Sequence, residues 1–220
     1  MPTFFTDRRN GSSLAPYQSL NLALHVGDAP ESVARNRGAL SAITAPVQFM
    51  NQVHGDEVVR IHQHSEIEPT CDALITTQKS IALAVLVADC IPLLLVSDRV
   101  VGAVHVGRRG LVNGIAIKTV HAMRELGAQS IHATLGPSIC GTCYEVPPEL
   151  AQEVTQLHSQ AASMTKAGTP ALDISKALIA DLKAVDVTAE SNGICTLENE
   201  NYFSYRRNNL TGRSAGVVWL

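Results

Sequence analysis

The sequence predicts an α+β fold, with residues 1–220 as one domain. The 220 residues are 45% hydrophobic and 17% charged, which is enough apolar material for one substantial core. Strand-like and helix-like segments are mixed along the chain without regular alternation, which favours α+β over a doubly wound parallel sheet. There is no internal repeat, low-complexity tract or linker that would divide the chain.

Apolar runs mark the expected strands. Residues 81–87 are apolar without a break, as is typical of a strand buried on both faces. Residues 93–96 and 100–106 predict two more strands, joined by a hairpin turn at 97–99. Shorter strand-like segments occupy 57–61, 202–205 and 215–219.

Capping residues and helical periodicity mark the expected helices. Asp28 precedes Ala-Pro-Glu and is the expected capping residue of a helix that runs to about Ile43. Apolar residues at helical spacing predict one helix from Leu111 to Leu126, which Gly127 ends. Further helices are expected at 147–158 and 173–185, and the small, polar residues 159–170 indicate a surface connection between them.

Charge and cysteine usage exclude several classes of protein. The formal net charge is -3 and the longest basic runs are pairs, such as those at 108–109 and 206–207, so a nucleic-acid partner is not expected. The most apolar stretch, 81–96, is interrupted by polar residues and is shorter than the roughly 20 residues that span a bilayer. The N-terminal residues do not resemble a signal peptide, and the five cysteines are an odd number. We expect a cytoplasmic protein with reduced thiols.

The predicted hairpin places two metal-ligand types together. A turn centred on 98–99 pairs His105 with Pro92, and Cys90 then lies diagonal to His105 on the same face. Diagonal neighbours are about 7–8 Å apart, a gap that one ion can bridge with bonds of about 2.3 Å to a thiolate and about 2.0–2.1 Å to an imidazole. A register slip of one residue would remove this arrangement.

His54 completes a candidate metal site. It lies in Asn-Gln-Val-His-Gly-Asp, just before the strand expected at 57–61. A His, Cys, His set from separate segments is typical of catalytic zinc, because three protein ligands leave a fourth position for water or substrate. Since buried histidines and cysteines are common, a purely structural interpretation of each residue remains open on spacing alone.

A candidate anion site follows His105. Residues 107–110 (Gly-Arg-Arg-Gly) lead into the helix expected near Leu111, and helix N-termini attract anions. A metal beside an anion site suits phosphate or a phosphorylated substrate. The alternative is that both arginines are solvated surface charge, which is less favoured for Arg109 than for Arg108.

Motifs along nearly the whole chain carry a resemblance to a known family. They lie at 16–22, 26–28, 36–37, 52–55, 71–76, 88–93, 103–110, 136–139, 144–146, 203–207 and 211–213. On these motifs the chain resembles the bacterial YfiH-like, laccase-domain-containing proteins, which are described as purine nucleoside phosphorylases with adenosine deaminase activity. The resemblance implies that His54, Cys90 and His105 are zinc ligands. It also implies a fold similar to the cytotoxic necrotising factor deamidases, with mixed sheets packed as a sandwich and helices outside.

The same resemblance implies the reaction and its partners. The substrates would be inorganic phosphate and a purine nucleoside: adenosine, inosine, guanosine or methylthioadenosine. Phosphate held by Arg109 would attack the sugar C1′, and zinc, with copper as the alternative metal, would activate water for attack on C6 of adenosine. Asp89 is either the proton carrier or a residue that orients a histidine. Gln52 and Asp72 are weaker candidates for substrate contacts, because polar loop residues often only satisfy backbone groups. A homodimer is compatible with the sequence.

The chain departs from the family pattern at several positions. Arg108 stands where tryptophan is usual, Cys140 where glycine is common, and Asn208 where an acid is common. The N-terminal residues before the match at Phe5 are fewer than usual and their glycine-rich motif is loose. These departures put an N-terminal edge strand in doubt.

Three other functions compete with this interpretation. A copper-dependent polyphenol oxidase needs many histidines spaced one apart, whereas only His62 and His64 have that spacing among eight histidines. A metal-free cysteine hydrolase or amidase would use Cys90 as nucleophile and His105 as base. A thiol sensor would use Cys140 and Cys143, although structural cysteines are the better interpretation of such a pair. His25 is expected at the surface, and Cys195 in packing.

Overall fold

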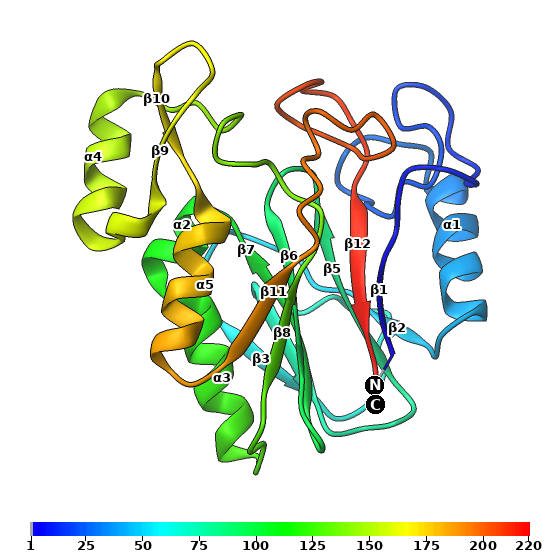
Figure 1. The fold of residues 1–220 in the computed structure, drawn as a ribbon. Coiled ribbons are helices and arrows are strands. Elements are labelled where there is room, and N and C mark those ends of the chain that lie inside the picture. The colour runs from blue at the N-terminus through cyan, green and yellow to red at the C-terminus, as the bar shows by residue number, and fades with distance from the viewer. Residues whose placement is uncertain (1) are drawn as a thin grey trace.

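Two β-sheets pack face to face in the computed structural model, which describes residues 2–220 and in that range forms a four-stranded and a six-stranded sheet (Figure 1). The four-stranded sheet has the order β1-β12-β5-β2, from strands Thr3–Phe5, Ser214–Val218, Ala82–Val87 and Val47–Gln48. The six-stranded sheet has the order β11-β8-β6-β7-β4-β3, from strands Thr188–Ser191, His132–Leu135, Ile91–Val96, Val101–Val106, Ala73–Thr76 and Val58–Ile61. Both contain parallel and antiparallel pairs, which confirms the predicted α+β fold with mixed sheets.

Helices cover the outer faces of both sheets (Figure 1). Helix α1 (Pro30–Ala42) packs on the four-stranded sheet, and α2 (Arg108–Asn113), α3 (Ile115–Glu125) and α5 (Ile174–Ala184) pack on the six-stranded sheet. Helix α4 (Pro148–Leu157) lies beside a small ribbon of β9 (Ala162–Met164) and β10 (Pro170–Leu172), with a 3₁₀ turn, Ser159–Ala161, between them.

The layered packing explains the unbroken apolar run of β5. Leu83 and Val85 contact the core between the two sheets, whereas Ala84 and Leu86 belong to the cluster that includes Leu40 of α1. Successive side chains of a strand point to opposite faces, so a strand between two cores needs apolar residues at every position. The prediction of a doubly buried strand at 81–87 is confirmed.

The register of the β6–β7 hairpin agrees with the sequence prediction. His105 pairs with Pro92, and the turn is closed by the N–H of Ser97, which donates to the carbonyl of Val100 at 3.0 Å. Strand β6 begins at Ile91, two residues earlier than expected, because Pro92 is accommodated within the strand. Cys90 therefore lies immediately before β6, close to the end of β7 that carries His105.

Two helix predictions need correction. The helix expected at 111–126 begins earlier, at Arg108, and is divided into α2 and α3 by Gly114, whose φ of 72° lies in the left-handed region that ends a helix. Asp28 does not cap α1: Ala29 is the capping residue, and the Asp28 carboxylate accepts from its N–H at 2.8 Å.

Three other segments also differ from the prediction. Residues 202–205 form an irregular loop rather than a strand, because the Arg207 guanidinium donates to the carbonyls of Tyr202 and Thr196 and fixes the segment. The doubted N-terminal strand is present as β1, which pairs antiparallel with β12 at the sheet edge. The connection at 159–170 contains the 3₁₀ turn and β9, and β10 begins at its last residue.

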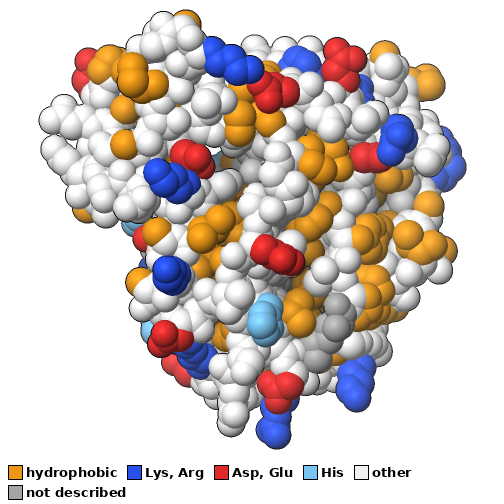
Figure 2. Space-filling model, viewed as in Figure 1, with side chains coloured by type: hydrophobic (Ala, Val, Ile, Leu, Met, Phe, Trp, Pro, Cys, Tyr) orange, Lys and Arg blue, Asp and Glu red, His pale blue; other side chains and the backbone are white. Residues whose placement is uncertain are grey.

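Charge is dispersed over the face of the molecule shown in Figure 2. Charged side chains of both signs are scattered there between hydrophobic ones. Within residues 2–220, no helix has the length and apolar character needed to cross a bilayer.

Candidate metal centre and substrate cavity

Three side chains from separate segments converge at one point. Ligand atoms of His54, Cys90 and His105 all lie within 4.8 Å of one another. His54 comes from the loop before β3, Cys90 from the β5–β6 connection, and His105 from the end of β7. The two imidazole rings meet edge to face, with centroids 4.7 Å apart and an interplanar angle of 74°. The structure thus brings together the three predicted ligands.

A buried carboxylate, Asp72, positions both histidines. It accepts from the backbone N–H groups of Val53, His54 and Gly55 at 3.1, 3.0 and 2.7 Å, and so stabilises the left-handed backbone of His54, whose φ is 58°. Its Oδ1 also lies 2.8 Å from Nδ1 of His105. Because Nδ1 is occupied, Nε2 of His105 is the nitrogen left for a metal, an arrangement found around many metal-bound histidines.

Asp72 is therefore a positioning residue. Its side chain is 0% exposed and is absent from the cavity wall, so the prediction of a substrate contact is wrong. Burial alone raises the pKa of Asp72, but hydrogen bonds from His105 and from the Gly55 N–H together hold the pKa below its ordinary value. The carboxylate is ionised at neutral pH, as the hydrogen bonds from its donors require.

The charges of Cys90 and His105 support each other. Burial raises the pKa of the Cys90 thiol, but the charge of His105 and hydrogen bonds from both histidines outweigh it and lower the pKa to about 6. Burial lowers the pKa of His105, but the Cys90 thiolate and Asp72 outweigh it and raise the pKa to about 9. Cys90 is thus held as a thiolate at neutral pH, which is the form that binds a metal or acts as a nucleophile.

The donor set fits one metal ion. One thiolate and two imidazoles are the ligands that zinc prefers, and all three line one cavity, toward which a fourth position can open. Gly107 provides the space for them: a Cβ at that position would lie 2.9 Å from Sγ of Cys90 and 3.6 Å from Cδ2 of His54.

The cavity above these residues has a volume of about 540 Å³, within the range of small-molecule sites. Three arginines line it: Arg108, Arg206 and Arg213. The Arg206 guanidinium lies over the ring of Tyr144 at 5.3 Å, and burial lowers the pKa of Arg213. Arg108 and Arg213 are partly buried, and their guanidinium groups favour an anionic ligand that replaces the water they have lost.

Two of the remaining predicted site residues line the cavity, and one does not. Arg109 is exposed and does not line the cavity, whereas its neighbour Arg108 does. The sequence favours Arg109 over Arg108 as the anion contact, so the structure reverses this preference. Helix α2 also begins at Arg108, so Arg109 lies inside its first turn. Gln52 lines the cavity, but its amide is paired with the backbone of Leu86, donating and accepting at 2.8 Å.

Asp89 lines the cavity and anchors its walls. Its φ is 92°, and its carboxylate accepts from the hydroxyl of Thr196 at 2.6 Å and from the N–H of Arg206 at 2.7 Å. Its carbonyl accepts from the N–H of Ile139 at 2.9 Å. His105 is held by Asp72 rather than by Asp89, and both the orienting role and the proton-carrier role of Asp89 stay predictions.

The sequence does not single out several of the wall residues. His25 is exposed, as expected, but it also lines the cavity, and partial burial lowers its pKa. Arg206, Tyr205 and Arg213 lie within the C-terminal family motifs, but no spacing rule connects that segment to His54. Their position depends on the loop that Asp89 anchors, which only the folded chain reveals.

Fold and site together define an α+β protein with a candidate metal centre in the wall of a cavity of small-molecule size. The family model described as multi-copper polyphenol oxidoreductase laccase matches residues 2–220, and the chain belongs to this family. This confirms the resemblance to YfiH-like, laccase-domain proteins.

Relatives and solved structures agree with the assignment. A purine nucleoside phosphorylase of Streptomyces coelicolor is 44% identical, with 98% of this chain and 94% of the relative covered. One of Corynebacterium glutamicum is 45% identical, with 98% and 93% covered. The crystal structure of a Neisseria meningitidis protein has a TM-score of 0.91 at 33% identity, covering 99% of this chain and 93% of that one. Bacillus licheniformis YfiH has a TM-score of 0.90 at 27% identity, covering 99% and 92%.

Proposed function

We propose that this chain is a zinc-dependent purine nucleoside phosphorylase that also deaminates adenosine. One observation carries the proposal. His54, Cys90 and His105 lie close together and line the same cavity as three arginines. Relatives named purine nucleoside phosphorylase support the reaction class. Adenosine, inosine, guanosine and methylthioadenosine are the proposed nucleosides, with inorganic phosphate as co-substrate.

The protein's residues divide between holding a metal and holding substrates. His54, Cys90 and His105 would bind the ion, and Asp72 keeps Nε2 of His105 directed at it. Zinc, with copper as the alternative, supplies Lewis acidity toward water and toward substrate oxygens when bound.

In phosphorolysis the arginines hold and orient phosphate. Guanidinium groups bind phosphate oxygens with two parallel hydrogen bonds, and the proposal assigns this role to Arg108 and Arg206, which line the cavity. A phosphate oxygen attacks C1′ of the ribose, the C1′–N9 bond breaks, and its electron pair leaves with the purine, which takes up a proton. Arginines aimed at the phosphate reduce the cost of bringing it to the sugar.

In deamination, water adds to C6 of adenosine and ammonia leaves, which gives inosine. This reaction needs a group that moves a proton from the water to the leaving nitrogen. Asp89 lines the cavity and is the proposed carrier. Its two oxygens already accept hydrogen bonds from the loop that carries Arg206, so an effect of Asp89 on activity can also arise through that loop.

A panel of nucleosides tests the proposal. Each nucleoside is incubated with and without phosphate, using zinc-replete and chelated protein, and free base and ammonia are measured. The proposal predicts phosphate-dependent base release and phosphate-independent ammonia release from adenosine, both lost on chelation. His54→Ala should remove both activities, whereas His121→Ala, a change at an exposed histidine of α3, should leave them intact. Absence of turnover of every nucleoside by zinc-replete protein would overturn the proposal.

A second candidate function is a metal-free cysteine hydrolase or amidase. The observation in its favour is the series Cys90, His105 and Asp72, in which Nδ1 of His105 lies 2.8 Å from the carboxylate, as in a catalytic triad. Such an enzyme would keep its activity after chelation and would lose it on alkylation of Cys90. The panel above therefore separates the two functions.

The geometry does not favour a multicopper oxidase. Within residues 2–220, His54, Cys90 and His105 form one of two groups with metal-ligand geometry, and the other contains no histidine. His62 and His64 belong to neither group. A copper cluster with several histidines is therefore not assembled by the described part of the chain.

A further inference from the structure

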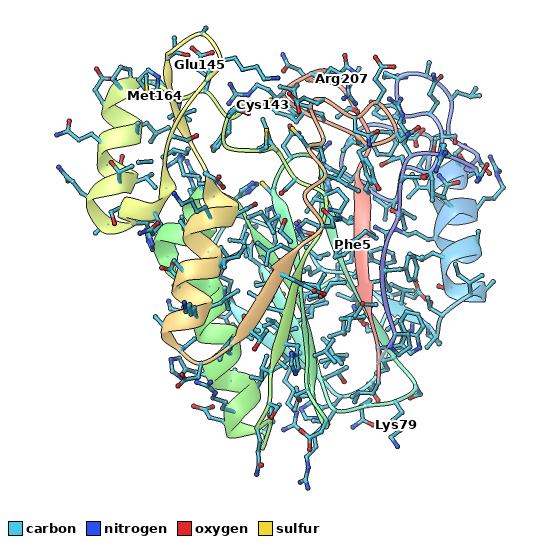
Figure 3. All side chains as sticks on the ribbon, in the orientation of Figure 1. Phe5, Lys79, Cys143, Glu145, Met164 and Arg207 are labelled. Carbon is cyan, nitrogen blue, oxygen red and sulfur yellow. The ribbon has the colours of Figure 1, made fainter. Side chains whose placement is uncertain are left out.

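We propose that Cys140, Cys143, Cys195 and Glu198 form a second metal site, a structural zinc site separate from the His54–Cys90–His105 centre. Ligand atoms of these four residues all lie within 4.8 Å of one another. Cys143 lies on the loop between β8 and α4, near the loop that carries Arg207 (Figure 3). This site goes beyond the proposed enzymatic function and does not depend on it.

Three cysteines, two of them in Cys-x-x-Cys spacing, are typical of structural zinc, and a carboxylate oxygen is also a zinc ligand. Cys140 and Cys143 are separated by two residues in Cys-Gly-Thr-Cys, the spacing that lets one turn present two thiolates to one ion. Cys195 and Glu198 come from a distant segment and complete four ligands. Thiolates bonded at about 2.3 Å in a tetrahedron are about 3.8 Å apart, so the observed cluster needs only a small contraction to coordinate an ion.

Backbone contacts hold the two segments together. Ser138 and Cys195 form a parallel bridge, in which the N–H of Ser138 donates to Ile194 and the N–H of Thr196 donates to Ser138, each at 3.1 Å. Within the first segment, the N–H groups of Cys143 and Tyr144 both donate to the carbonyl of Cys140 at 3.0 Å. The positions of the ligands are therefore fixed by backbone structure that does not depend on a metal.

Hydrogen bonds to the ligands suit ionised groups. The N–H of Cys140 donates to Sγ of Cys195 at 3.4 Å, and Sγ of Cys140 lies 3.3 Å from the hydroxyl of Thr142. Lys166 pairs with Oε1 of Glu198 at 2.9 Å, which leaves the second carboxylate oxygen available for a metal. Such partners stabilise thiolate or carboxylate charge at Cys140, Cys195 and Glu198 and orient their donor atoms.

A disulfide explains the cluster less well than a metal does. A bond between Cys140 and Cys143 would use two of three adjacent thiols, and would leave Cys195 and Glu198 without a role. All five cysteines are free thiols in the structure. A metal ion with tetrahedral coordination would use all four groups, and this would explain why they lie together.

The consequence is that a zinc ion would fix two walls of the substrate cavity. Ile139 and Tyr144 flank the Cys-Gly-Thr-Cys turn and line the cavity, and Tyr205 and Arg206 lie beyond Glu198 on the other segment. An ion joining the two segments would hold these walls together without contact with substrate. The site is therefore structural, and its loss should loosen the cavity rather than remove the catalytic metal.

Metal counting on the full-length protein tests the proposal. Protein purified with zinc is analysed for zinc per chain by mass spectrometry of the metal, with circular dichroism as the folding control. We expect two equivalents in the unmodified protein, one in Cys143→Ser, one in Cys90→Ala, and none in the double variant. Cobalt-loaded Cys90→Ala should show thiolate-to-cobalt charge-transfer absorption that disappears in the double variant.

Glu198→Gln provides a second, milder variant if Cys143→Ser does not fold. Loss of an outer partner lowers metal affinity about 10–100-fold, and loss of a ligand should lower it by at least that factor. Glu200→Gln, a change at an exposed acid two residues later, is the matched control and should keep the original affinity. One equivalent in the unmodified protein, two in Cys143→Ser, or a mass lower by two hydrogens that maps to a Cys140–Cys143 disulfide would each overturn the proposal.

Discussion

The change Asp72→Asn should damage both stability and metal binding. In the structure, Oδ1 accepts from the His54 N–H and from His105, and Oδ2 accepts from the N–H groups of Val53 and Gly55. An asparagine retains one acceptor oxygen, so either orientation of its amide leaves two of these four donors without an acceptor. Each unsatisfied buried donor costs roughly 1–3 kcal/mol, so the expected loss is about 2–6 kcal/mol in the free energy of unfolding.

The same change releases His105, a proposed metal ligand. Without a carboxylate on Nδ1, His105 loses its fixed tautomer and ring orientation, and zinc affinity should fall about 10–100-fold. Urea unfolding measures the stability of metal-free protein, and competition with a coloured chelator measures the affinity. Asp56→Asn, at an exposed carboxylate that pairs with Lys118, is the matched control. Original stability and original affinity in Asp72→Asn would refute the positioning role.

Three further predictions concern the cavity and its thiolate. Arg108→Ala should raise the KM for phosphate about 10–100-fold, because it removes a charged hydrogen bond worth roughly 1.5–3 kcal/mol. Arg109→Ala should change this KM by no more than about twofold. Equal effects of the two changes in initial-rate assays would contradict the assignment of Arg108 to the cavity wall. In chelated protein, the rate of Cys90 alkylation should be independent of pH well above about 6 and should fall about tenfold per pH unit below it, because the lowered pKa keeps Cys90 as a thiolate down to that pH. Peptide mapping measures the rate, and a transition near pH 9 would contradict this prediction. Asp89→Asn should reduce phosphorolysis and deamination together if Asp89 acts through the loop of Arg206, whereas selective loss of ammonia release would establish it as the proton carrier.

Local sequence pattern is sufficient to predict much of the fold. The doubly buried run at 81–87 and the short turn at 97–99 determine the strand and the hairpin register, because burial and turn length are local properties. The hairpin register in turn places Cys90 near His105. The break at Gly114 has no comparable signal, because the apolar spacing continues across it and periodicity does not report a single left-handed residue.

The cavity wall cannot be predicted to the same extent. From the sequence, Asp72 is a candidate substrate contact. The sequence does not show that its carboxylate is buried and accepts hydrogen bonds from three backbone N–H groups. The sequence favours Arg109 over Arg108, and its pattern predicts a helix that begins three residues later than the observed one. Cys195 joins Cys140 and Cys143 through a bridge between distant segments, a contact without a local signal.

Zinc add-back to chelated protein tests the central claim most directly. Release of free base from inosine and phosphate is measured as zinc is added in steps to metal-free protein, alongside His54→Ala and the control His121→Ala. The account predicts that turnover is absent without metal, returns as zinc is added to the unmodified protein and the control, and does not return in His54→Ala. Full turnover in the metal-free protein, or recovery in His54→Ala equal to that of the control, would contradict it.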